Sequence, residues 1–166
     1  MTVFGIDPGT ATTGYGVVKN SRGNSLECVS YGCITTPKEK TTGDRLVTLE
    51  KELTHALNEY KPDVVGVERL YFFKYLKSAI PVSEARGVIL LAIAKKKLPV
   101  FELTPLQVKM AITGYGRADK KQMQRMVQQT LKLLRVPKPD DAADALGLAI
   151  AGIFLLKKEK NLATRF

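Results

Sequence analysis

Two short apolar runs in this sequence each end in a carboxylate, and this feature limits the possible folds more than any other. The first run, Val3 to Ile6, is followed by Asp7, and the second, Val64 to Val67, by Glu68. Runs of this length and composition are typical of strands at the centre of a sheet. A charge beside such a strand is costly to bury unless it is compensated. If the two strands are neighbours, Asp7 and Glu68 lie close together.

Hydrophobic periodicity predicts three strands in a row, followed by alternating helices and strands. The expected strands are Val3 to Asp7, Gly14 to Lys19, Leu26 to Thr35, Val64 to Glu68 and Val100 to Leu103. The expected helices are 42–60, 79–97, a short one after Thr104-Pro105, Ala118 to Leu134, and Asp140 to about Lys158. This order predicts an α/β domain with a mixed five-stranded sheet flanked by helices. It resembles the ribonuclease-H-like fold, although the actin-like ATPase fold begins in the same way.

Composition narrows the function classes. A length of 166 residues is typical of a single domain. We expect that domain to span residues 1–158 and to be followed by a basic tail at 159–166. The net charge of +10 favours a polyanionic partner such as nucleic acid. Cys28 and Cys33 fit no zinc pattern and are interpreted as small core side chains. We recognise no signal peptide, and the apolar run from Ala145 to Leu156 is too short to span a bilayer, so a cytoplasmic protein without a membrane role is expected.

A second group of acids opens the last predicted helix, Asp140-Asp141-Ala142-Ala143-Asp144. Asp141 and Asp144 share a helical face, and Asp140 and Asp144 could share one too. The spacing therefore leaves open which residue joins Asp144, and helix capping is an ordinary alternative role for these acids. If the acids of this helix and of the strand ends converge, they need hard cations such as Mg²⁺ or Mn²⁺. Two such ions about 4 Å apart can activate a water and stabilise the leaving oxygen in phosphodiester hydrolysis.

Four groups of short motifs follow one another over residues 1–155. They are Gly5-Ile6-Asp7-Pro8-Gly9-Thr10 with Thr13-Gly14-Tyr15-Gly16, Val67-Glu68 with Ser83-Glu84-Ala85-Arg86-Gly87-Val88, Gln107-Val108-Lys109 with Gly114-Tyr115-Gly116 and Lys120, and Asp141-Ala142-Ala143-Asp144-Ala145-Leu146. In this order they closely resemble the RuvC family of Holliday-junction resolvases. Any one group alone is weak, but the four together are highly specific. The resemblance implies a metal-dependent endonuclease that cuts four-way DNA junctions in recombination and repair.

The resemblance also implies roles for individual residues. Its catalytic, metal-binding carboxylates are Asp7, Glu68, Asp141 and Asp144. It thereby selects Asp141 over Asp140. At the position of Asp141 some relatives carry histidine. Lys109 and Lys120 match the family's basic residues near the scissile phosphates, and Tyr71 matches its aromatic wedge, where relatives often have Phe. The implied cofactor is Mg²⁺, with two ions per site and Mn²⁺ as a substitute.

The residues themselves support a nucleic-acid partner. The segment from Arg69 to Lys77 holds basic and aromatic side chains and no acid. Basic groups attract backbone phosphate, and rings stack on unpaired bases. Arg69 and Lys74 are therefore candidate DNA contacts, and at least one of the two phenylalanines in this segment is expected in the core. Arg117 and Lys121 open a later helix and can clamp a phosphate, although a solvated helix face explains Lys121 equally well.

Symmetry suggests how such a protein would assemble. A four-way junction has approximate two-fold symmetry, so a homodimer with one site per subunit can nick two opposed strands. The helix at 79–97 is the expected interface. The resemblance adds the branch-migration proteins RuvA and RuvB as partners.

Three other functions compete with this interpretation. An actin-like ATPase would share the first motif, but it needs two such domains and a second phosphate motif that is missing here. Another ribonuclease-H-like nuclease, for example one acting on RNA–DNA hybrids, would use the same carboxylates. A non-catalytic junction-binding module gains nothing from acids that face phosphates. The only histidine, His55, is interpreted as a surface residue, so the sequence offers no rival catalytic set.

Overall fold

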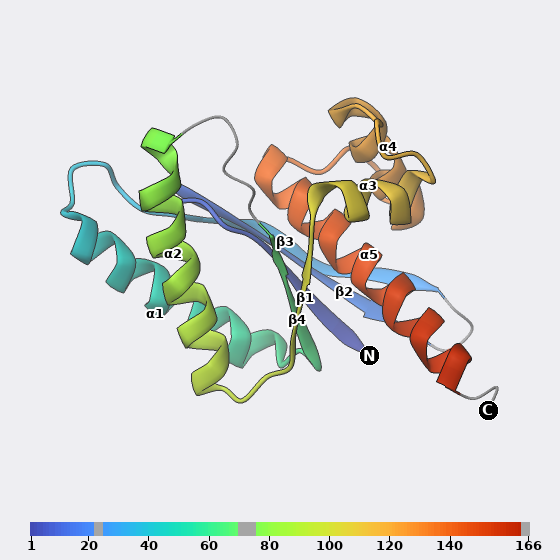
Figure 1. The fold of residues 1–166 in the computed structure, drawn as a ribbon, viewed down its shortest axis with the longest axis horizontal. Coiled ribbons are helices and arrows are strands. Elements are labelled where there is room, and N and C mark those ends of the chain that lie inside the picture. Colours follow the sequence, from blue (N-terminus) through green and yellow to red (C-terminus); the bar gives the residue numbers. More distant parts are fainter. Residues whose placement is uncertain (22–24, 70–75, 164–166) are drawn as a thin grey trace.

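The computed structural model describes the backbone of residues 1–21, 25–69 and 76–163, with side chains except at 76–78 and 158–163. In these ranges the strands form one sheet in the order β3-β2-β1-β4-β5 (Figure 1). β1 and β2 are antiparallel, as are β2 and β3, whereas β4 runs parallel to both β1 and β5. The predicted mixed five-stranded sheet is therefore confirmed. The strand bounds are β1 Thr2–Asp7, β2 Thr12–Asn20, β3 Leu26–Thr35, β4 Val64–Glu68 and β5 Val100–Leu103.

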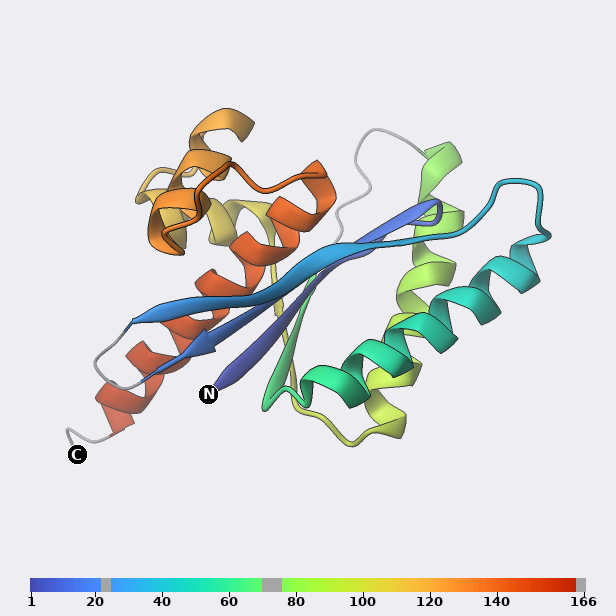
Figure 2. The same ribbon diagram turned by 180° about the vertical axis from the view of Figure 1, so that it is seen from behind.

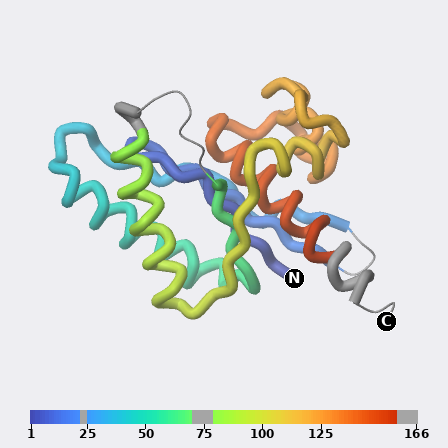
Figure 3. The backbone as a smooth tube through the Cα atoms, in the orientation of Figure 1, coloured from blue at the N-terminus to red at the C-terminus, as the bar shows by residue number. Residues whose placement is uncertain are grey.

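Helices cover both faces of this sheet (Figures 1 and 2). One face packs against α1 and α2, and the other against α5, with α3 and α4 outside α5. Each face has its own hydrophobic core, one around Leu53 and Ile89 and the other around Leu146 and Ile150. In Figure 3 the chain leaves α2, follows β5 and enters α3, so it passes from one face to the other. The helix bounds are α1 Thr42–Tyr60, α2 Leu76–Lys95, α3 Pro105–Thr113, α4 Lys120–Thr130 and α5 Asp140–Ala163.

Glycines let α5 lie directly on the sheet. A Cβ atom at Gly5 would collide with the backbone carbonyl of Ala145, and one at Gly14 with the carbonyl of Asp141. Gly14 is paired across the sheet with Asp7, the last residue of β1. Larger side chains here would force the helix outward, because overpacked contacts are relieved by backbone shifts. The glycines therefore place the first turn of α5 over the end of β1.

Local signals explain where α1 and α4 end. α1 spans the predicted residues, because the Thr41 side chain caps its start and Lys61 leaves the helix in a left-handed conformation, with φ 42°. α4 is shorter than the predicted Ala118 to Leu134. Asp119 caps its start, and Lys132, with φ 52°, turns the chain out of the helix just after its last residue, Thr130.

α2 is shifted toward the N-terminus from its predicted bounds of 79–97 and ends at Lys95, whereas α5 extends beyond its predicted end. α2 begins at Leu76, before the predicted start at 79, so Pro81 lies inside the helix. α5 continues past Lys158 to Ala163, into the segment predicted to be a basic tail. The division into a domain at 1–158 and a tail at 159–166 stays a prediction. Within the described ranges, no helix combines the length and apolar character needed to cross a membrane.

Candidate active site

The two strand-end acids meet at one edge of the sheet. β1 and β4 are adjacent and parallel, and Ile6 is paired with Val67. The next residues of the two strands are Asp7 and Glu68, and the Asp7 carboxyl donates a hydrogen bond to Glu68. The prediction that neighbouring strands bring these two acids together is confirmed.

The first two turns of α5 add carboxylates to this pair. The charges of Asp144 and Asp141 both act on Asp7, and that of Asp144 also acts on Glu68. The structure thus gathers acids from β1, β4 and α5 at one place. Asp140 is not among the charges that act on Asp7, so the geometry distinguishes two neighbours that sequence spacing could not.

Burial and repulsion perturb both strand-end acids. Burial is the largest cause of a rise in the pKa of Asp7 from 3.8 to about 8. The neighbouring charges follow as causes in the order Glu68, Asp144 and Asp141. Burial, followed by the charge of Asp144, raises the pKa of Glu68 from 4.5 to about 7. Shifts of this kind show that the protein alone does not compensate the negative charge gathered here.

Lys120, the first residue of α4, contacts the acids that α5 contributes to this region. Its Nζ lies 3.4 Å from Oδ2 of Asp144 and 3.3 Å from Oδ2 of Asp140. Burial raises the pKa of Asp144, and the Lys120 ammonium offsets part of that rise. Asp140 also accepts from Lys138 at 2.8 Å and from Gln124 at 2.9 Å. Hydrogen bonds from Lys138, Gln124 and Lys120, in that order, lower the pKa of Asp140 to about 2.

A groove of about 300 Å³ opens beside these acids. Two of the acids and two lysines lie on its walls, and the remaining lining is largely apolar. Lys109 and Lys120, both predicted to face the scissile phosphates, therefore border the same opening as Glu68 and Asp144. The lining residues are Glu68, Pro105, Val108, Lys109, Lys120, Met123 and Asp144.

The donors of the cluster are of the kind that hard cations prefer. Carboxylate oxygens suit Mg²⁺ and Mn²⁺, and the raised pKa values mark uncompensated charge that a cation would neutralise. Among the described residues, however, no three carboxylate, histidine or cysteine side chains lie close enough together to hold a metal ion. Asp7 is hydrogen-bonded to Glu68, while Asp144 pairs with Lys120. The donor set is of the kind that a hard cation takes, and holding one requires these side chains to move closer together.

Of the other residues predicted to contact DNA, Arg69 is held by an ion pair, whereas Arg117 and Lys121 are exposed to solvent. Arg69 directly follows Glu68, and its Nε and Nη2 donate to Oε2 of Glu102 at 3.3 and 3.2 Å. Arg86 of α2 pairs with the other carboxylate oxygen of Glu102. Glu102 therefore ties the residue after Glu68 to α2. Arg117 and Lys121 are exposed. Tyr71 and Lys74 lie outside the described residues, as do Phe72 and Phe73, at least one of which was predicted in the core.

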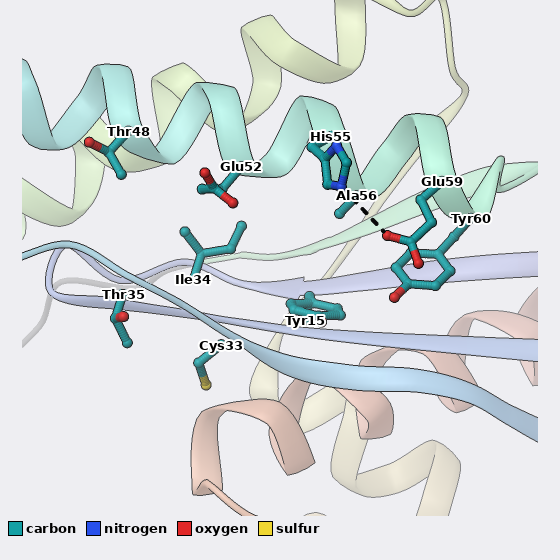
Figure 4. A pocket seen from close by; sticks show the side chains of 10 residues that line it. All are labelled: Tyr15, Cys33, Ile34, Thr35, Thr48, Glu52, His55, Ala56, Glu59 and Tyr60. Atoms are coloured by element: carbon teal, nitrogen blue, oxygen red, sulfur yellow. Dashed lines mark ion pairs between the residues drawn. The ribbon is translucent and has the colours of Figure 1, made fainter.

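A second groove, of about 360 Å³, lies between α1 and strands β2 and β3 (Figure 4). His55 lies on its rim with 77% of the side chain exposed, and its Nε2 is 3.9 Å from Glu59. The rings of Tyr15 and Tyr60 stack with their centroids 6.4 Å apart. His55 is thus a surface residue, as predicted.

Three neighbours of the site escaped the sequence analysis. Gln124 is only 8% exposed, and its position one helical turn after Lys120 was the available signal. Glu102 interrupts the apolar strand β5, and an acid in a strand was the signal there. Cys33, predicted to be a core side chain, is half-buried. Burial raises the pKa of its thiol, and the charges of Asp141 and Asp7 add to the rise, so Cys33 also borders the acids.

Comparison with known proteins agrees with this geometry. The sequence pattern of the family described as crossover junction endodeoxyribonuclease RuvC matches residues 3–152. The RuvC protein of Alkaliphilus oremlandii is 50% identical over 150 residues, which are 90% of this chain and 91% of that protein. The structure of Thermus thermophilus RuvC matches with a TM-score of 0.88 and 30% identity, over 96% of this chain and 97% of the other.

A second structure of the Thermus thermophilus protein, in complex with a Holliday-junction substrate, matches with a TM-score of 0.87 and 28% identity. That match covers 95% of this chain and 96% of the other. These likenesses confirm the predicted ribonuclease-H-like architecture. The chain belongs to the RuvC family of crossover junction endodeoxyribonucleases.

Proposed function

We propose that this protein resolves four-way DNA junctions by paired, symmetric nicks, made by metal-dependent hydrolysis of phosphodiesters in homologous recombination and DNA repair. One observation carries the proposal. Acids from β1, β4 and α5 converge beside a groove that Lys109 and Lys120 also line. A pure DNA-binding module gains nothing from carboxylates that face phosphates. The similar structure of Thermus thermophilus RuvC holds a Holliday-junction substrate, which supports the same substrate here.

Nucleases of this family are metal-dependent. The proposed cofactor is Mg²⁺, with two ions per site and Mn²⁺ able to substitute. The carboxylates that would hold the ions are Asp7, Glu68, Asp141 and Asp144. When bound, the ions activate a water for attack and stabilise the leaving oxygen. Asp7 holds its proton up to about pH 8 and would release it when it becomes a ligand, so metal affinity rises with pH in this range.

The basic side chains have different proposed roles. Lys109 and Lys120, on the groove wall, neutralise the scissile phosphate and hold it next to the acids. Arg117 and Lys121, exposed beside them, contact the flanking backbone. Arg69, Tyr71 and Lys74 are proposed to act at the crossover, where Tyr71 stacks on an unpaired base. Phosphate contacts of this kind make binding salt-dependent.

The proposed homodimer forms through α2. Five of the exposed positions of this helix repeat at alternating spacings of four and three residues, which is the pattern of a helix–helix seam, and Ser83 and Lys95 are exposed beside them. Ile80 is 69% and Leu91 53% exposed, and a Cβ atom at Gly87 would have open space around it. A second α2 could therefore approach closely at the glycine. The positions that share this face are Ile80, Glu84, Gly87, Leu91 and Ala94.

The cellular setting is part of the proposal. A resolvase acts after junctions have been moved along DNA, so RuvA and RuvB are the proposed partners, and the cytoplasm is the proposed location. The nuclease is proposed to be a single domain of residues 1–158, followed by a basic segment at 159–166.

Nicking of a synthetic immobile junction tests the proposed function. The parent protein and an Asp7→Asn variant are compared in Mg²⁺, with linear duplex and an RNA–DNA hybrid as other substrates. Paired nicks at symmetric positions on the junction alone, lost in the variant, are expected. Preferential cleavage of the hybrid would instead indicate another ribonuclease-H-like activity. Junction binding by the parent without any nicking would contradict the proposal.

A further inference from the structure

Asp140 lies next to the acid cluster of Asp7, Glu68, Asp141 and Asp144, but its own partners are lysine and glutamine side chains outside that cluster. Its Oδ2 is 3.3 Å from Lys120 Nζ, and its Oδ1 accepts from Lys138 and Gln124. Lys120 in turn reaches Asp144, with its Nζ 3.4 Å from Oδ2. The ammonium of Lys120 is therefore held between one carboxylate of the acid cluster and one outside it.

The best anchored member of this arrangement is Gln124. Its side chain is 8% exposed, and its amide donates to Asp140 at 2.9 Å. A buried amide without a partner is costly, so this bond fixes Asp140 against α4. Gln124 and Lys120 lie one turn apart on the same face of α4. The first residue of α5 is thus docked onto the helix that carries Lys120.

We propose that Asp140 is a positioning residue, which holds the Lys120 ammonium beside Asp144 at the mouth of the active-site groove. The inference rests on the proposed function only in that Lys120 has a phosphate to meet there. Lys120 has a long side chain with several freely rotating bonds and is half exposed, with 51% of its side chain accessible. A single exposed ion pair restrains such a chain weakly, whereas two carboxylates fixed on α5 restrain it more. Asp140 accordingly acts through Lys120 and not on DNA or metal.

The proposal is tested with Asp140→Asn, which keeps the side-chain shape but turns a neutral amide toward Lys120. Glu39→Gln, at an exposed loop position, removes the same charge elsewhere. The first readout is the lysine ammonium region of ¹H–¹⁵N spectra of the protein in EDTA, with the Lys120 signal assigned from its loss in Lys120→Ala. The signal is expected to disappear in Asp140→Asn and to persist in Glu39→Gln. An unchanged Lys120 signal in Asp140→Asn would overturn the proposal, whatever the nicking rate.

The second readout is single-turnover nicking of the junction in a double-mutant cycle. Asp140→Asn is expected to slow nicking by about tenfold, as partners that orient active-site groups typically do, and to leave junction affinity unchanged or tighter. It should have no further effect in a Lys120→Ala background. Equal slowing in both backgrounds, or a parent-like rate, would show that Asp140 does not act through Lys120. A parent protein that fails to nick would refute the proposed function, and the spectra would still test the positioning role.

Discussion

Replacing Asp7 by asparagine is expected to stabilise this protein in the absence of metal. The folded protein raises the pKa of Asp7 from 3.8 to about 8, chiefly by burial and then by the charges around it. At pH 7 the folded state therefore holds a proton that the unfolded chain releases. Over roughly three pH units, at about 1.4 kcal/mol each, this lowers the free energy of unfolding by about 4 kcal/mol.

The destabilisation caused by the raised pKa of Asp7 depends on pH. The penalty is absent below about pH 4, grows as pH rises toward 8, and is constant above that value, because only between the two pKa values do the folded and unfolded states differ in bound protons. An asparagine avoids the penalty but still loses water on burial, so a net gain of about 2–4 kcal/mol is expected at pH 7. For a chain of this size the gain corresponds to a rise in Tm of roughly 4–16 °C.

The assay is thermal unfolding in EDTA at pH 4 and pH 7 for the parent, Asp7→Asn and Glu39→Gln. The Tm of Asp7→Asn should exceed that of the parent at pH 7 and equal it at pH 4. The Tm of Glu39→Gln should equal that of the parent at both pH values. Added Mg²⁺ should raise the Tm of the parent more than that of Asp7→Asn, because only the parent keeps the full set of ligands. Equal melting of parent and Asp7→Asn at pH 7, or an advantage that persists at pH 4, would refute the reasoning.

Three further substitutions test the structure around the site. Gly14→Ala should lower the free energy of unfolding by about 1–3 kcal/mol in a denaturant titration and slow nicking, because its Cβ meets the Asp141 carbonyl; parent-like stability and rate would count against this close contact. Leu91→Glu should convert a dimer into monomers in sedimentation analysis, and a variant that remains dimeric would place the interface elsewhere. Glu102→Gln should lower the free energy of unfolding by about 1–3 kcal/mol, since it removes the shared partner of Arg69 and a second guanidinium; an unchanged denaturation midpoint would show that these pairs are solvent-screened.

Much of the fold was predictable because its signals are local. Apolar runs bounded by turn residues gave β3, β4 and β5 their exact predicted ends, and the helical period followed by Pro62 gave α1 its bounds. The end of α4 was missed, because the left-handed conformation of Lys132 has no strong sequence signal in a lysine. The true start of α2 was missed because Pro81 suggested a first turn there.

The candidate site was predictable to the extent that strand ends and helix periodicity determine it. Asp7 and Glu68 follow from adjacent parallel strands, but the choice between Asp140 and Asp141 depends on how α5 is rotated on the sheet. That rotation is set by tertiary contact with Gly14, which no local pattern reveals. The roles of Gln124 and Glu102 likewise arise from partners distant in sequence.

Calorimetric titration of Mn²⁺ at pH 7 tests the central claim, that the gathered carboxylates form the metal site. The parent, Asp7→Asn and the exposed control Glu39→Gln are compared in buffers of different ionisation enthalpy. The parent and Glu39→Gln should bind Mn²⁺ and release more than one proton, from Asp7 and in part from Glu68, whereas Asp7→Asn should bind more weakly and release fewer. Absence of Mn²⁺ binding by the parent, or equal binding and proton release by Asp7→Asn, would contradict the account.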